Sequence, residues 1–545
     1  AICLIVGGVG MLPDDYENLS QSVIASNFMS GNILSSLTSK NYWNALNDYK
    51  PLMHLWYLGI LVEFYIVFPA LMIMFDKAVR RKRRDVSDYR AKTNIFLGLL
   101  CVVSILCYLN PFTFGINPNT VEGIRFYWLQ NRFFEICLGG LVGLNISSLS
   151  FLSRRRWISP VSIWMLLGVI GIGLVNFDIT AIGSHLPVVG AAINYRADLV
   201  LPPKVLLFLT VILSCIVVAQ NHDGNPLSRF LVRSEFLAHV GRMSLSIFVF
   251  HQILIAFYRY YVTNALSPAS VAAYLAVVLC VSFVTYRLVE QKVRGSKTAW
   301  ACIGTAWIVT SAAALMIYLN AGVVRDVPEL DVAKNDVHRN MHAEYCDRIY
   351  QYDREFTQDD GRIKVLIIGN SFARDWANIL LESEMKDKIE ISYIYANYQL
   401  DKLDRNRHVD RIRRSDYVFI FANKSDVPEY LWENVKDADR VFGIGTKNFG
   451  QNNGSIYRHR NEPGYFAITV AGNPEYEAVN RAWAEEWRAN YLDMIEKVRA
   501  PDGRIRVFSD ERKFISQDCE HLTRGGARFY AGLFDMRAIF STDTQ

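Results

Sequence analysis

The sequence has few charged residues in its first 320 positions, where long apolar segments follow one another. Charged residues make up 20% of the whole chain and hydrophobic residues 51%, but these averages conceal a sharp change near Asn320. A run of about twenty apolar residues is long enough to cross a bilayer as a helix. An ordinary soluble fold is therefore excluded for the first part, whereas the remainder has the patterning of a globular domain.

The sequence also lacks internal repeats, low-complexity tracts and stretches that interleave basic with aromatic residues. Repeat architectures and a nucleic-acid-binding surface are therefore not expected, and neither is a metal site or a bound cofactor. Cysteine is scarce outside the apolar segments, because only Cys346 and Cys519 of the nine fall in the C-terminal part. An oxidising compartment permits a disulfide between them, and two free buried thiols are the alternative that the spacing leaves open.

Eight segments of the first part are long and apolar enough to be complete membrane spans. Residues 1–12 have the composition of the end of another span, and the chain begins with Ala rather than Met inside this apolar run. We therefore expect further N-terminal residues, including earlier helices, in the natural protein. The eight spans lie near residues 52–76, 93–110, 125–148, 158–177, 204–220, 239–262, 268–290 and 299–319.

Basic residues are concentrated in every second connection between these spans. Connections that are rich in lysine and arginine remain on the cytoplasmic side of a membrane. The last span then exits outward, so the chain after residue 320 is expected outside the cytoplasmic membrane. The intervening connections at 110–124, 178–203 and 263–267 contain a single basic residue, Arg196. The basic positions are 80–84, 154–156, Arg229, Arg233, Arg287, Lys292, Arg294 and Lys297.

From residue 345 onward, short β-branched runs alternate with helical stretches. This alternation predicts a doubly wound α/β domain with a parallel sheet, whose ligands bind at the carboxyl ends of the strands. The fold class is therefore a polytopic α-helical membrane domain (1–320), a linker (321–344) and an α/β domain (345–545). The predicted strands are 363–369, 390–395, 416–422, 440–445 and 504–508, and the main predicted helices are 372–384 and 475–498.

Two short motifs at the ends of the α/β domain contain residues suited to catalysis. Ser371 follows the apolar run 365–368, at a turn from strand to helix, and Asp518 and His521 stand three residues apart. A serine, a histidine and an acid are the groups used for nucleophilic acyl chemistry. Alone, Ser371 could equally cap the following helix, and an isolated Asp-x-x-His is often a surface feature. Their joint occurrence, in this order, favours the catalytic interpretation.

Residues 365–371 and 518–523 resemble the nucleophile block and the D-x-x-H block of the SGNH (GDSL-like) esterase and acyltransferase family. The resemblance implies that Ser371 is the nucleophile, that His521 is its general base and that Asp518 orients the imidazole. Asn370 departs from the family, which usually has aspartate there. The family also has an asparagine in its oxyanion hole, for which Asn423 is the first candidate and Asn448 the rival. Each could instead form an Asx turn after a strand, and the Gly- and Asn-rich stretch 443–455 is expected to contact substrate.

Ionisable residues occur inside several predicted spans, where they are costly. The segments 51–65, 132–140, 241–252 and 286–291 resemble motifs of the acyltransferase-3 family of bacterial membrane O-acyltransferases. Leu61-Val62-Glu63 departs from the Glu-Glu-Gln that is common in the family, and the family's proposed catalytic histidine lies in a helix that would precede this chain. Internal pairing that locks helices together is the alternative role for the ionisable residues. The candidates for contact with acyl donor or acceptor are His54, Glu63, Arg132, Glu135 and His251.

Together the two resemblances predict a two-part O-acyltransferase. The helical half would take an acyl group, expected to be acetyl from acetyl-CoA at the cytoplasmic face, and pass it across the lipid bilayer. The outer domain would form an acyl-Ser371 intermediate and deliver the group to an envelope glycan or lipid-linked glycan, such as O-antigen, capsule or peptidoglycan. The expected location is the bacterial inner membrane, with the C-terminal domain in the periplasm. An extracytoplasmic esterase, and a transporter or flippase with a glycan-binding domain, are the alternatives.

Overall fold

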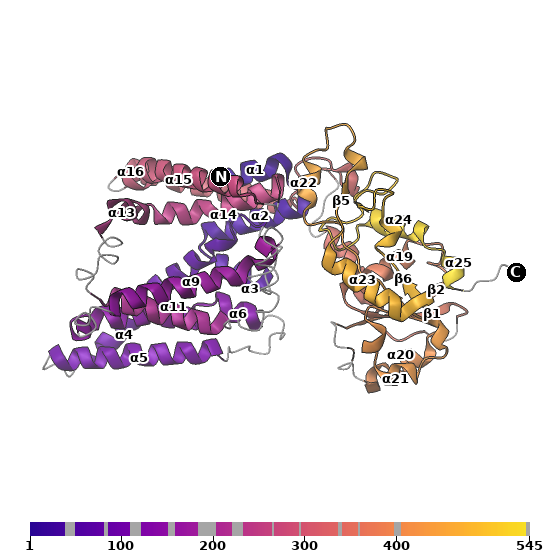
Figure 1. The fold of residues 1–545 in the computed structure, drawn as a ribbon, viewed down its shortest axis with the longest axis horizontal. Coiled ribbons are helices and arrows are strands. Elements are labelled where there is room, and N and C mark those ends of the chain that lie inside the picture. The colour runs from indigo at the N-terminus through magenta and orange to yellow at the C-terminus, as the bar shows by residue number, and fades with distance from the viewer. Residues whose placement is uncertain are drawn as a thin grey trace. The chain divides into compact units, whose positions relative to one another are not determined.

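The computed structural model describes most of the chain as two compact units, which we consider separately (Figure 1). The helical unit contains residues 25–256 and 267–304, and the α/β unit contains residues 1–24, 257–266 and 305–545. All structural statements below refer to the described residues, which are 1–38, 49–80, 86–109, 121–150, 158–183, 203–220, 233–263, 266–293, 296–335, 341–357, 360–396, 400 and 405–540. The basic clusters 81–84 and 154–156, Arg196, Arg229 and Arg294 lie outside them.

The helical unit consists of long apolar helices that run beside one another (Figure 1). Helices α5 and α7 pack through buried Leu97, Phe134 and Cys137. Ser104 on α5 joins the two helices, because its hydroxyl donates to the Gln130 carbonyl and accepts the Phe134 amide proton. The main helices that lie wholly or partly in this unit are α3 (Gly31–Thr38), α4 (Trp56–Arg80), α5 (Val86–Leu109), α6 (Val121–Tyr127), α7 (Leu129–Asn145), α9 (Ile158–Gly183), α11 (Pro203–Val218), α13 (Glu235–Arg242), α14 (Ser244–Tyr261), α15 (Pro268–Thr285) and α17 (Lys297–Leu319), and the ends of α14 and α17 belong to the α/β unit.

Every predicted span coincides with helix, but the described helices are not all long enough to span a membrane. Four are long and apolar enough, namely Met53–Val79, Asp88–Leu109, Pro268–Val293 and Lys297–Leu319. The predicted span 239–262 is bent by 66° between α13 and α14, and this pair makes a fifth candidate if it is counted as one. Within α9 and α11 the apolar stretches found, Pro160–Gly171 and Val205–Val218, are shorter than this, as is α7 in place of the predicted span 125–148.

A five-stranded parallel sheet forms the centre of the α/β unit, with strand order β2-β1-β3-β4-β6. Strand β1 lies inside the sheet, between β2 and β3, and its residues Val365 to Ile368 are completely buried. Successive side chains point to opposite faces, so Val365 and Ile367 pack against one layer while Leu366 and Ile368 pack against the other. The strands are β1 (Ile363–Gly369), β2 (Ile389–Tyr395), β3 (Tyr417–Ile420), β4 (Val441–Ile444) and β6 (Tyr491–Leu492).

Helices cover both faces of this sheet, as the prediction of a doubly wound fold requires. Figure 1 shows α19 and α24 together on one side and α20 and α21 on the other. Trp376 and Leu380 of α19 join the first layer, and Ile412 of α20 and Leu431 of α21 join the second. The helices are α19 (Ser371–Leu381), α20 (Arg405–Arg414), α21 (Glu429–Trp432), α23 (Pro474–Trp487) and α24 (Arg524–Leu533).

Two predictions about secondary structure were wrong. The predicted strand 504–508 is not part of the parallel sheet, because β7 (Ile505–Arg506) pairs antiparallel with β5 (Thr469–Val470). The predicted helix 475–498 ends at Trp487, and the fifth parallel strand, β6, lies inside the same segment. The helix stops because the backbone of Arg488 has a positive φ of 53° and a ψ of −123°, which cannot continue a right-handed helix.

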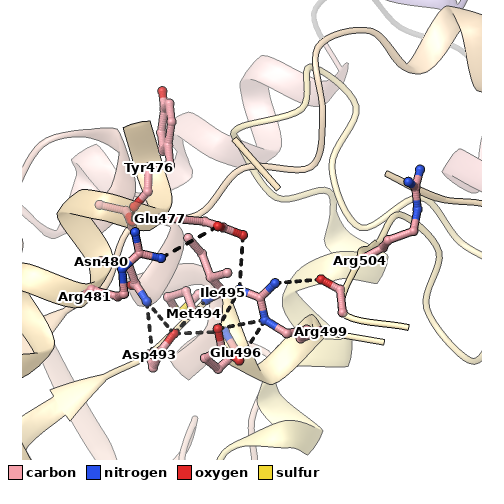
Figure 2. Close-up of polar contacts among 12 residues, drawn as sticks. Tyr476, Glu477, Asn480, Arg481, Asp493, Met494, Ile495, Glu496, Arg499 and Arg504 are labelled. Carbon is pink, nitrogen blue, oxygen red and sulfur yellow. Dashed lines mark hydrogen bonds and ion pairs between the residues drawn. The ribbon is translucent and has the colours of Figure 1, made fainter. Parts of the chain in front are cut away.

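A network of polar side chains fixes α23 against β6 and the turn that follows (Figure 2). Both carboxylate oxygens of Asp493 lie 3.0 Å from the Asn480 amide nitrogen, and one of them also accepts backbone N–H groups of residues 495 and 496. Arg499 bridges Glu477 and Glu496. In Figure 2 the Tyr476 ring points away from this network, and its hydroxyl donates to Glu520 at 2.8 Å.

Candidate active site

Ser371 is the first residue of α19, just after the carboxyl end of β1. The backbone turns at Gly369, whose φ is 149° and where a Cβ atom would collide with the side chains of Phe421 and Ala373. Asn370 is the N-cap of the helix, because its side-chain oxygen accepts the Phe372 amide proton at 2.9 Å. The family's aspartate is thus replaced by another good capping residue. Since Asn370 caps the helix, the Ser371 hydroxyl is left for another partner.

That partner is His521, so the structure brings the predicted serine, histidine and acid into one line. His521 Nε2 lies 2.8 Å from Ser371 Oγ, and His521 Nδ1 lies 2.6 Å from Asp518 Oδ2. An ionised carboxylate can only accept, so Nδ1 donates to Asp518 and Nε2 of the neutral ring is left to accept the serine proton. The other oxygen, Asp518 Oδ1, accepts the backbone N–H groups of Glu520 and His521.

The loop that contains His521 is held on both sides. Cys519 has a left-handed backbone with a φ of 71°, and its carbonyl accepts the Phe449 amide proton at 2.8 Å. The Leu522 amide donates to Asp375 Oδ2 on α19 at 3.0 Å. Thr523 then caps α24 through the Gly526 amide. Cys346 and Cys519 are both buried, and no disulfide joins them, so the pairing that the sequence allowed is not formed.

The charges around His521 favour its protonated form. Burial lowers the pKa of the imidazole, but the hydrogen bond and the charge of Asp518 outweigh burial and raise the pKa above its ordinary value. Asp375 adds to this increase and Lys447 opposes it. Because an imidazole with a raised pKa keeps its proton to higher pH, the basic form of His521 is lost as the pH falls through this value.

The two candidate asparagines differ in what their amides already bind. Asn423 follows β3, and its amide nitrogen donates to Glu486 at 2.8 Å and to Ser425 at 3.0 Å. Asn448 follows β4, and its side-chain oxygen accepts the Gly450 amide proton. No acceptor for the Asn448 amide nitrogen is found among the described residues. The stretch 443–455 that contains it is largely buried.

The sequence did not predict two buried charged residues, Lys447 and Asp375, that contact the neighbours of the catalytic groups. Lys447 Nζ lies 2.8 Å from Asp375 Oδ2, and the side chains are 1% and 0% exposed. The same ammonium group lies 3.7 Å from the centre of the Phe372 ring. A lysine inside the Gly-rich stretch was the only available signal, because nothing in the sequence connects it with Asp375. In the part of the chain that the structure describes, no group of three or more His, Cys, Asp or Glu residues could hold a metal ion.

In the helical unit, the candidate residues form pairs. Arg132 contacts Glu135 at 2.8 Å and stacks on Phe126, and Glu63 accepts a hydrogen bond from Asn32 at 2.8 Å. The rings of His54 and His251 lie 5.0 Å apart, so the structure brings together two motifs that are almost 200 residues apart in the sequence. His54 is buried, and neither of its ring nitrogens makes a hydrogen bond of ordinary geometry among the described residues.

Comparison with known proteins identifies the first half of the chain. The sequence model of a family described as an acyltransferase domain matches residues 2–287, more than half of the chain. Over 260 residues the chain is 24% identical to the peptidoglycan O-acetyltransferase OatA of Listeria monocytogenes, a match that covers 47% of this chain and 37% of that protein. No solved structure matches the chain. With its apolar helices and these motifs, the chain belongs to the acyltransferase-3 family and is a multi-pass membrane protein.

Proposed function

We propose that this protein transfers an acyl group to a hydroxyl of an envelope glycan, through an acyl-enzyme intermediate on Ser371. The observation that carries the proposal is the hydrogen-bonded line from Asp518 through His521 to Ser371. This line lies in the same chain as a membrane domain of an acyltransferase family. The name of the similar Listeria protein supports acetyl as the acyl group and peptidoglycan as a first choice of acceptor.

The helical unit would supply the acyl group. We propose acetyl-CoA as the cytoplasmic donor, and the α/β domain is assigned to the other side of the membrane because the basic connections alternate along the sequence. Of the ionisable residues in the helical unit, buried His54 and the half-buried His251 ring beside it are the best placed to contact a donor. Glu63, Arg132 and Glu135 already have polar partners.

In the first step on the α/β domain, Ser371 attacks the acyl carbon. His521 Nε2 takes the proton from Ser371 Oγ while the bond from oxygen to carbon forms, and the donor's leaving group then departs with a proton from the imidazolium. Asp518 holds the ring in the required tautomer and stabilises its positive charge. In the second step a glycan hydroxyl attacks the acyl carbon while His521 takes its proton. The bond between that carbon and Ser371 Oγ then breaks, and the imidazolium returns the proton to Ser371 Oγ.

The negative charge on the tetrahedral intermediate requires hydrogen-bond donors. Ser371 is the first residue of α19, so its backbone N–H has no partner inside the helix and can serve as one donor. We propose the Asn448 side chain as a second donor, because Lys447 beside it contacts Phe372 and Phe449 is bonded to the catalytic loop. Asn423 is the weaker candidate, since Glu486 and Ser425 already accept from its amide.

A pocket beside Asn423 is a suitable site for one sugar of the acceptor. It has a volume of about 590 Å³ and lies at the carboxyl edge of the sheet, after β3. Trp432 offers an aromatic face, and charged groups that can bond to hydroxyls surround it. Ile368 of β1 pairs with Ile420 of β3. Ser371 follows the first by three positions and Asn423 follows the second by three, so both residues lie at the same edge of the sheet. The lining residues are Lys424, Ser425, Trp432, Glu485, Glu486 and Arg488.

Replacement of Ser371 tests the proposal directly. We expect Ser371→Ala to abolish ester-linked acetyl on envelope glycans in cells, because no other described hydroxyl lies on His521 Nε2. The measurement is release of acetate from isolated envelope polymers by mild base. Ser383→Ala is the matched control, since this serine lies beyond the other end of α19 and its hydroxyl bonds only to local backbone. Full acetylation by Ser371→Ala would refute the acyl-serine mechanism.

Replacement of Asp518 tests the role of the charge beside His521. In Asp518→Asn the raising effect on the pKa of His521 is lost, so the acidic limb of the rate profile should move to lower pH. The plateau rate should also fall, by a factor on the order of 10⁴, because the amide favours the wrong imidazole tautomer. The measurement is hydrolysis of p-nitrophenyl acetate against pH by the whole protein in detergent. An unchanged limb at an unchanged rate would exclude Asp518 from the mechanism.

Replacement of Trp432 tests the acceptor pocket. We expect Trp432→Ala to raise KM for a soluble glycan acceptor by about tenfold, the equivalent of roughly 1.4 kcal/mol of lost contact. Hydrolysis of p-nitrophenyl acetate should be unchanged, because the small ester does not reach the pocket. Trp432→Phe keeps an aromatic face and should retain most of the affinity. Equal KM values for all three proteins would show that the acceptor binds elsewhere.

A further inference from the structure

The buried ion pair of Lys447 and Asp375 is the most unusual feature near the catalytic groups. Its atoms lie 2.8 Å apart, and both side chains are essentially inaccessible to solvent. Asp375 Oδ1 has no hydrogen-bond donor among the described residues. Removing two charges from water is costly, and a buried pair of this kind is weak evidence of a gain in stability. We therefore ask whether this ion pair has a role in the reaction of Ser371 and His521.

The pair connects three segments that meet at the active site. Asp375 lies one helical turn after Ser371 on α19, and it accepts the amide proton of Leu522, the residue after His521. Lys447 precedes Asn448 in the loop after β4, and its ammonium group lies on the ring of Phe372, the residue after Ser371. One pair of charges thus contacts the neighbours of the nucleophile, of the base and of the proposed oxyanion donor.

Other charged or titratable groups near His521 are engaged elsewhere or are neutral. On its own loop, Asp518 binds the imidazole directly and Glu520 accepts from the Tyr476 hydroxyl at 2.8 Å. On α19, Arg374 pairs with Asp347 at 2.5 Å. On α18 (Met341–Asp347), the Cys346 thiol is neutral because burial raises its pKa. Asp375 and Lys447 therefore remain as the two buried charges that act on the ring without touching it.

We propose that Lys447 and Asp375 are positioning residues that hold the His521 loop on α19 and offset each other's electric field at the imidazole. The inference rests on the proposed function, because it assigns the pair a role in that reaction. Asp375 alone would favour the protonated ring, and Lys447 alone would favour the neutral ring. Asp375 holds the loop through the Leu522 amide and Lys447 offsets its charge, so the ring responds mainly to Asp518.

Two single substitutions should therefore move the pH profile in opposite directions. Lys447→Met removes the cation and leaves Asp375 unopposed, so the acidic limb of p-nitrophenyl acetate hydrolysis should move to higher pH. Asp375→Asn leaves Lys447 unopposed, so the limb should move to lower pH. We expect each shift to be about half a pH unit or more, and the double variant should return close to the wild-type midpoint. The assay uses the full chain in detergent.

A purely structural role gives a different result. It predicts lower rates in both single variants with no opposed movement of the midpoint, and this outcome would overturn the proposal. If one single variant does not fold, the proposal is tested with the other single variant and the double variant. The double variant contains no buried charge at these two positions. A shift of that single variant in the expected direction, with the double near wild type, supports the proposal, and any other pattern contradicts it.

The outcome is also separable from the proposed function. The wild-type protein and Ser371→Ala are measured in the same assay, and hydrolysis that persists in Ser371→Ala would refute the acyl-serine mechanism whatever the pair does. Lys436→Met and Asp416→Asn provide the matched control. These residues form a partly exposed ion pair of the same kind, at 2.7 Å, at the opposite end of β3. Their substitution should leave the pH midpoint unchanged.

Discussion

The parallel pairing of β1 with β2 and β3 is the constraint on which the active site depends. Parallel strands end at one edge of a sheet, so every loop that follows β1, β3 or β4 begins at the same edge. The complete burial of Val365 to Ile368 fixes the register, because a slip of one residue would exchange the two faces of the central strand. Ser371 is therefore placed by the hydrophobic core and not by contacts of its own.

The base reaches this edge by a different means, since its loop belongs to no strand of the parallel sheet. Backbone hydrogen bonds hold it in place, with the Cys519 carbonyl bonded to Phe449 and the Leu522 amide bonded to Asp375. The left-handed backbone at Cys519 costs free energy that these contacts must offset. The nucleophile is thus fixed by packing and the base by polar contacts, so changes to buried charges are expected to act mainly on the base.

The sequence was most informative where one element decides the outcome. The apolar run before Ser371 predicted a central strand and its turn, and the apolar segments predicted helices, because each pattern depends on local burial. Features that depend on distant partners could not be predicted. Strand β6 has only two residues and follows a helix that ends at Arg488, inside a segment with helical patterning. Glu486, 63 positions after Asn423, decides what that asparagine binds, and only the fold brings the two together.

The same reasoning narrows the chemistry of the helical unit. Charged groups inside a membrane domain are tolerated when they have partners, and Arg132, Glu135 and Glu63 all have them. Because these charged side chains already form ion pairs and hydrogen bonds with each other or with Asn32, fewer of their donor and acceptor atoms remain for a substrate. Buried His54 instead has the His251 ring beside it and no ordinary hydrogen bond among the described residues. An uncharged side chain is cheaper to bury than an ion, and an imidazole can accept or donate a proton. We therefore propose that acyl-donor chemistry takes place at the two histidines and that the paired charges have a supporting role.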